Sequence, residues 1–221
     1  MVRSVSSVAG AVQGSKRIAL LEILIGLGLI EATVWSARPV QRYLFWISAA
    51  WFLCHAVLAT YHRKPLGLGL PQFKVTAVLL TAPVFLAGTV VANGAALGTL
   101  HHIFGTVAPL QHASTYIVWA IVQQYLQQSY FFVRFEQLIS RGAVASLVTA
   151  AMFGIVHLPN PVLAPVTFAG GWIMSEIFRR YRCVVPLGIA HGLVGLAIAV
   201  TVPDYLLHHM RVGLSYLTYP H

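Results

Sequence analysis

Two histidines lie in apolar stretches of the chain, where an imidazole could act as an acid or a base. His157 ends the run 143–158 in the sequence Phe153-Gly-Ile-Val-His157, and His191 lies within the run 184–202. Histidine titrates close to neutral pH, so its side chain can take up and release a proton during catalysis. We therefore treat His157 as the candidate general base. His191 is the candidate that stabilises developing negative charge or relays a proton.

Four glutamines lie within six residues of another apolar run, which extends from about residue 112 to residue 135. Side chains three and four positions apart share a helix face, so the four amides form one polar patch. The patch consists of Gln123, Gln124, Gln127 and Gln128, and its stripe continues to Tyr116, Trp119 and Arg134. An unpartnered polar group is costly in hydrocarbon, so this face should look into the protein or a wet cavity. Alternatively, the amides only hold neighbouring helices together.

These residues define an expected pocket. Its expected catalytic members are His157, His191, Gln123, Gln124 and Gln128, with the amides orienting substrate or water. Its expected substrate-binding members are Asn160, Arg134, Tyr116, Trp119 and Phe153. Helices rise by about 1.5 Å per residue, which offsets the two histidines by on the order of 10 Å along the membrane normal. A shared pocket therefore requires tilted or displaced helices.

The composition indicates a membrane protein. The chain has 221 residues, of which 58% are hydrophobic and 9% are charged, which is too apolar for a soluble domain. The net charge of +9 does not indicate nucleic-acid binding, because the basic residues lie at the ends of apolar runs, where they orient membrane helices. We therefore expect an integral membrane protein that contacts membrane lipid and no nucleic acid.

Apolar runs divide the chain into about seven transmembrane helices, which predicts an all-α, polytopic membrane bundle. The predicted spans are 18–37, 43–61, 75–97, 113–135, 143–158, 163–178 and 184–202. Residues 1–15 are predicted to be an N-terminal leader and 16–221 a single transmembrane domain. With the N-terminus in the cytoplasm, eleven of the fourteen Lys and Arg residues fall on the cytoplasmic side. This asymmetry predicts a cytoplasmic N-terminus and an external C-terminus.

Residues 110–200 resemble the CPBP family of intramembrane proteases, the CAAX-processing and bacteriocin-processing (Abi) proteins. The family carries Glu-Glu-x-x-x-Arg, then Phe-x-x-x-His, then His-x-x-x-Asn or a variant, on successive spans. Here Phe153, His157 and His191 match the later motifs in order and helical context. The resemblance implies a CPBP-like core in predicted spans four to seven and a lipidic, prenylated or peptide substrate. We expect the plasma membrane as its location, which is the inner membrane in a bacterium.

The first motif departs from the family pattern at all three of its positions. The paired Glu fall on Gln123 and Gln124, the Arg falls on Gln128, and the last Asn falls on Gly195. In the family, the Glu pair and the first His are thought to activate water, while the second His and the Asn stabilise an oxyanion. An amide cannot take a proton from water near neutral pH, so the standard hydrolytic arrangement is absent.

Three functions are compatible with these residues. The first is a CPBP-like intramembrane protein whose Gln and His pocket acts on or binds a lipidic, prenylated or peptide substrate. The second is a membrane enzyme that modifies an isoprenoid or another lipid with His as acid and base. The third is a non-catalytic scaffold or chaperone for a membrane partner. We expect no cofactor and no metal, because no two histidines have metal-ligand spacing inside a predicted span.

Overall fold

A computed structural model describes residues 5–62, 66–69, 71–101 and 109–219, and the regular elements in this part of the chain are helices. The long helices are α1 (Val5–Val34), α2 (Arg38–Tyr61), α3 (Phe73–Ala96), α4 (Pro109–Gln124), α6 (Gly142–Val156), α7 (Leu163–Tyr181) and α8 (Val185–Thr201). A π-helical segment (Tyr125–Phe132) and α5 (Val133–Leu138) continue directly from α4. The C-terminal segment contains α9 (Asp204–Leu207), a 3-10 turn (His208–Met210) and α10 (Leu214–Leu217). The predicted all-α class is confirmed for these residues.

The helix bounds follow the predicted spans closely, except at the N-terminus. The fourth predicted span corresponds to α4, the π-helical segment and α5 taken together. Helix α1 begins at Val5, so the predicted leader is helical over residues 5–15, and residues 1–4 lie outside the described part of the chain. The short helices after α8 were not among the predicted spans.

The number of membrane crossings is not confirmed by helix length. Within the described residues, α2 and α3 are long and apolar enough to cross a membrane, whereas α6 and α8 are apolar but shorter. The 15 residues of α6 extend over about 22 Å, less than the roughly 30 Å of a bilayer core. Large apolar side chains such as Leu53, Phe85 and Val78 are exposed on α2 and α3, which is consistent with an integral membrane protein. Seven crossings and the orientation of the termini stay predictions.

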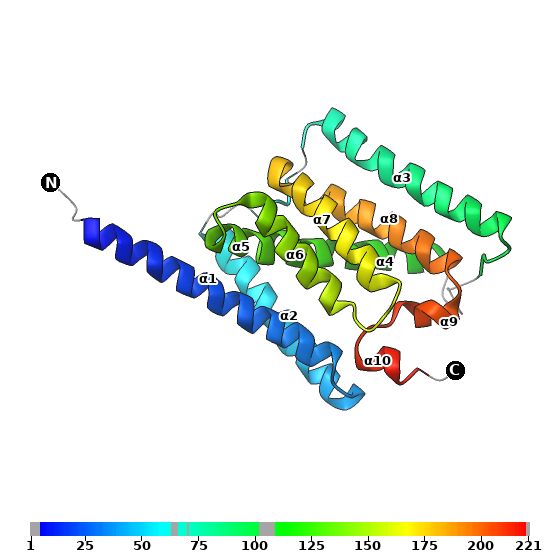
Figure 1. The fold of residues 1–221 in the computed structure, drawn as a ribbon, viewed down its shortest axis with the longest axis horizontal. Helices are drawn as coiled ribbons and strands as arrows, with labels where there is room; N and C mark the ends of the chain where they lie inside the picture. The colour runs from blue at the N-terminus through cyan, green and yellow to red at the C-terminus, as the bar shows by residue number, and fades with distance from the viewer. Residues whose placement is uncertain (1–4, 63–65, 70, 102–108, 220–221) are drawn as a thin grey trace.

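The helices pack as neighbouring pairs around the α4–π–α5 stretch (Figure 1). Helices α1 and α2 form a pair at one side of the molecule, and α1 also contacts α5. At the opposite side α3 packs on α8, which in turn packs on α4. Helices α6 and α7 form a third pair that contacts the π-helical segment. Helices α4, α6, α7 and α8 correspond to predicted spans four to seven. The candidate residues on these helices therefore lie where the pairs meet the α4–π–α5 stretch.

Glycines on α8 allow α4 to approach it closely. A Cβ atom at Gly188 would lie 2.5 Å from Ile121, and one at Gly192 would lie 2.9 Å from Ile117. Contacts this short are not tolerated by real side chains, so only glycine permits the observed packing. The close packing brings the polar face of α4 against the helix that carries His191.

A buried ion pair joins α1 to the end of the α4–π–α5 stretch. Arg134 is 4% exposed, and its Nε donates to Glu22 Oε2 at 2.8 Å while its Nη1 donates to the Tyr130 carbonyl at 2.6 Å. The guanidinium also lies over the Tyr130 ring and donates to His55 Nε2 on α2. The Tyr130 hydroxyl donates to the Glu22 carbonyl at 2.7 Å. This cluster fastens both N-terminal helices to the core.

The π-helical segment explains why Arg134 does not continue the amide stripe. The predicted stripe assumed uniform α-helical spacing from Gln123 to Arg134. In π-helical geometry hydrogen bonds run from i to i+5, so each turn holds roughly one more residue and the following side chains are rotated. Arg134 therefore faces α1 and α2, while the amides face α7 and α8.

Removing the negative partner of Arg134 should destabilise the protein measurably. We expect Glu22→Gln to cost on the order of 2 kcal/mol, less than for a fully buried pair because Glu22 is partly exposed. The measurement is the thermal unfolding midpoint in one detergent. Glu176→Gln is the matched control, because its partner Arg179 is exposed and such pairs contribute about 0–1 kcal/mol. Equal shifts in both variants would contradict the structural role of the buried pair.

Candidate functional site

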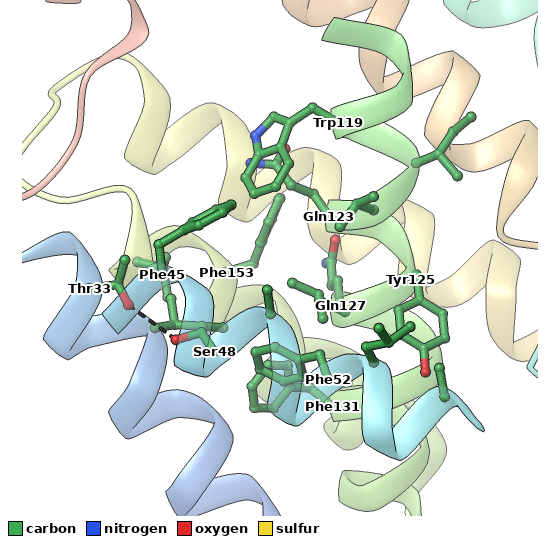
Figure 2. Close-up of a pocket in the computed structure, with 18 of the residues that line it drawn as sticks. Thr33, Phe45, Ser48, Phe52, Trp119, Gln123, Tyr125, Gln127, Phe131 and Phe153 are labelled. Carbon is green, nitrogen blue, oxygen red and sulfur yellow. Dashed lines mark hydrogen bonds between the residues drawn. The ribbon is translucent and has the colours of Figure 1, made fainter. Parts of the chain in front are cut away.

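Two neighbouring cavities lie between the helices that carry the candidate residues. The larger, of about 660 Å³, is lined almost entirely by apolar side chains from α2, α4, the π-helical segment and α6. Figure 2 shows Phe45, Ser48 and Phe52 on one of its walls, with Trp119 and Gln123 on another. The smaller, of about 230 Å³, lies among α4, α6, α7 and α8. The residues that line both cavities are Trp119, Gln123, Phe153, His157 and Val212.

His157 lines both cavities and lies at the C-terminal end of α6. Its side chain is 8% exposed, and its Nδ1 lies 2.6 Å from the Phe153 carbonyl one turn earlier. Because a carbonyl oxygen only accepts, Nδ1 carries the proton of the neutral ring and Nε2 carries the free lone pair. His157 is therefore held in the tautomer that a general base requires.

His191 lies on α8 and lines the smaller cavity beside His157. The ring of Phe153 makes edge contacts with both imidazoles, with centroids 4.7 Å from His157 and 5.9 Å from His191. The offset expected along the membrane normal therefore does not separate the two histidines. The short helix α6 and the contact of α8 with α4 bring them to one cavity.

Of the four amides, Gln123 and Gln127 line the larger cavity, whereas Gln124 and Gln128 line neither cavity. Gln124, Gln127 and Gln128 are at most 1% exposed. Gln124 Nε2 donates to Gln127 Oε1 at 2.9 Å and lies 3.2 Å from His191 Nδ1, and Gln128 Nε2 donates to Gln124 Oε1 at 3.2 Å. Gln123 instead lines both cavities. The predicted pocket members thus lie together, with Gln123, His157 and His191 lining the cavities and Gln124 and Gln128 behind them.

Tyr116 occupies the space left by the glycine at the family's Asn position. A Cβ atom at Gly195 would lie 2.3 Å from the Tyr116 hydroxyl. Tyr116, Gly195 and His191 all line the smaller cavity. A phenolic hydroxyl can donate a hydrogen bond, as the amide of Asn does. The Tyr116 hydroxyl of α4 thus occupies the space that a side chain at position 195 of α8 would enter.

Two predicted substrate-binding residues do not line the cavities. Arg134 lies in the cluster with Glu22 and His55. Asn160 is fully buried, and its Nδ2 donates to the carbonyls of Leu207 and Arg211 at 2.9 and 3.0 Å. Its Oδ1 accepts from the backbone amides of Val162, just before α7, and Leu163, the first residue of α7. The remaining predicted members, Trp119, Phe153 and Tyr116, do line them.

The C-terminal segment supplies a wall of the site that sequence reasoning missed. His208, His209 and Met210 have positive φ angles of 45°, 51° and 61°, which makes one left-handed turn between the two carbonyls held by Asn160. Met210 lines the smaller cavity, and Val212 lines both. Nothing in the local sequence indicates this contact. The sequence did indicate Gln127, because this residue belongs to the predicted amide patch, although it is not among the predicted pocket members.

No metal centre is found in the described part of the chain. Within it, no three His, Cys, Asp or Glu side chains lie together so as to hold a metal ion. The residues that line the two cavities include no Asp or Glu among those that the structure describes. Among the described lining residues, the site therefore offers imidazoles, amides, phenols and the hydroxyls of Ser and Thr as its polar groups.

The fold and site define a helical, membrane-type protein with two histidines from different helices at one cavity. Residues 105–197 match the family model described as type II CAAX prenyl endopeptidase Rce1-like. This match agrees with the resemblance of residues 110–200 to the CPBP family. No curated protein and no solved structure matches the chain.

Asn160 should be important for the structure around the site. Asn160→Ala removes two hydrogen bonds to the C-terminal segment and two from the start of α7, and we expect it to cost about 1–3 kcal/mol. Hydrogen exchange should become faster in residues 204–219. The matched control is Asn93→Ala on the exposed face of α3, where the side chain bonds only to its own helix. Unchanged exchange in Asn160→Ala would contradict the anchoring role.

Proposed function

We propose that this protein binds a lipid-modified substrate, with its hydrocarbon chain in the larger cavity and its polar end between His157 and His191. The observation that carries the proposal is that a large apolar cavity lies beside a small one lined by both imidazoles. An apolar chamber with a few convergent polar groups is the usual form of a ligand site. The family description names prenyl endopeptidases, which supports a prenylated peptide as the substrate class.

Hydrolysis at this site would use His157 as the base. Its Nε2 would take a proton from water as the water oxygen attacks the substrate carbonyl. Negative charge on the carbonyl oxygen would be stabilised by hydrogen bonds from His191 and Tyr116. The protonated His157 would then give its proton to the leaving amine as the carbon–nitrogen bond breaks. The amide of Gln123 would orient the water or the substrate, since it cannot itself accept the proton.

The second candidate is binding without turnover, as a scaffold or chaperone for a lipid-modified partner. The lack of carboxylates among the described lining residues favours it, because the family's water-activating Glu pair falls on Gln123 and Gln124. Chemistry on an isoprenoid with His157 as acid and base would use the same chamber. The three functions share one binding mode and differ in what happens after binding.

Binding is tested by filling the larger cavity. Ala49 lines it, whereas the adjacent Ala50 is exposed and does not. We expect Ala49→Trp to weaken binding of a fluorescent farnesylated peptide by about tenfold or more, because the indole occupies the space of the chain. Ala50→Trp is the matched control and should bind like the wild type. Titration in nanodiscs measures both, and equal affinities would overturn the placement of the lipid chain.

Turnover is tested with two substitutions at the polar end. Removing a general base lowers rates by roughly 10²–10⁴-fold, so His157→Ala should abolish cleavage of a prenylated peptide followed by mass spectrometry. Gln124→Glu brings back a carboxylate of the family motif and should increase hydrolysis, whereas Gln137→Glu at an exposed position of α5 should not. Full activity in His157→Ala would remove this residue from the mechanism. Binding without cleavage by the wild type would select the second candidate.

A further inference from the structure

The orientation of the buried amides can be traced from one backbone carbonyl. Gln127 Nε2 donates to the Gly171 carbonyl at 3.2 Å. Since a carbonyl oxygen can only accept, the amide nitrogen of Gln127 must face α7 and its oxygen must face Gln124. A Cβ atom at position 171 would lie 2.7 Å from that nitrogen, so glycine is what allows the amide to reach the carbonyl. The anchor therefore depends on both residues.

The same constraint passes from Gln127 to His191. Gln127 Oε1 accepts one N–H of Gln124 at 2.9 Å, and Gln124 Oε1 accepts from Gln128 at 3.2 Å. These contacts fix which end of the Gln124 amide is nitrogen. Its second N–H faces His191 Nδ1 at 3.2 Å, so Nδ1 accepts and the proton of the neutral ring lies on Nε2.

The two imidazoles consequently have opposite tautomers. His157 carries its proton on Nδ1 and presents a lone pair at Nε2, because the Phe153 carbonyl occupies Nδ1. His191 carries its proton on Nε2, because the amide of Gln124 occupies Nδ1. Both rings line the smaller cavity, which therefore has one imidazole acceptor and one imidazole donor. Such a pair suits a reaction in which one group gives up a proton to His157 Nε2. His191 Nε2 can at the same time donate a hydrogen bond to an oxygen that gains negative charge.

We propose that Gln127 is a positioning residue which, anchored on the Gly171 carbonyl, orients Gln124 and thereby keeps His191 in the tautomer with its proton on Nε2. Gln127 acts through its neighbour and touches no reacting atom. The role given to this tautomer rests on the proposed function, in which His191 Nε2 donates a hydrogen bond to the carbonyl or headgroup of a bound substrate. The tautomer itself is a property of the protein without substrate, and it can be measured as such.

The experiment is nitrogen NMR of the full chain in nanodiscs with ¹⁵N-labelled histidine. The resonances of His157 and His191 are assigned from their loss in His157→Asn and His191→Asn. In the wild type we expect a pyrrole-type Nε2 and a pyridine-type Nδ1 for His191, and the reverse for His157. Gln127→Met keeps the side-chain length but removes both hydrogen bonds, so Gln124 can rotate and His191 should populate both tautomers. His157 should be unaffected, and Gln137→Met, at an exposed position, is the matched control.

Two results would overturn the proposal. One is a wild-type His191 with its proton on Nδ1. The other is an unchanged His191 tautomer in Gln127→Met, which would reduce Gln127 to a packing residue that affects stability alone. If Gln127→Met does not fold, Gly171→Ala tests the same anchor by pushing a methyl group against the Gln127 nitrogen. Because no substrate is used, failure here is distinct from failure of the farnesylated peptide to bind.

Discussion

The structure depends on how the polar groups placed in its apolar interior find hydrogen-bond partners. Three buried glutamines each make a hydrogen bond to another amide, a carbonyl or an imidazole, although Gln128 Oε1 has no partner among the described residues. In surroundings of low dielectric constant such bonds are strengthened, and an unmade bond is correspondingly costly. The hydrogen bonds that the network makes leave few choices for the orientation of the groups at its edge.

The same constraint operates on the other side of the π-helical segment. Arg134 is buried against Glu22, His55 and the Tyr130 carbonyl, so its charge is compensated within the protein. The widened turns between Gln124 and Arg134 send the amides towards α7 and α8 and the guanidinium towards α1 and α2. One continuous helical stretch thus serves two polar clusters with different roles, one that holds the bundle together and one that faces the cavity.

Helix positions and the polar residues of the pocket could be predicted because both follow from local patterns. Apolar runs locate helices, and motif order brought His157, His191 and the glutamines to one expected site. The direction of the Arg134 side chain could not be predicted, because it depends on a π-helical segment that helical periodicity does not reveal. Asn160 resembled a pocket residue by its nearness to His157, yet its amide is used up by α7 and the C-terminal segment. Such partners are distant in sequence, so only the tertiary structure identifies them.

The left-handed turn at His208–Met210 has a consequence for how this protein is handled. The family match ends at residue 197, but Met210 and Val212 form part of the chamber wall. A fragment trimmed to the matched region would keep both imidazoles and lose the cover over them. Affinity tags and reporter fusions are accordingly better attached ahead of α1, because the wall of the cavities extends beyond the matched region to Val212.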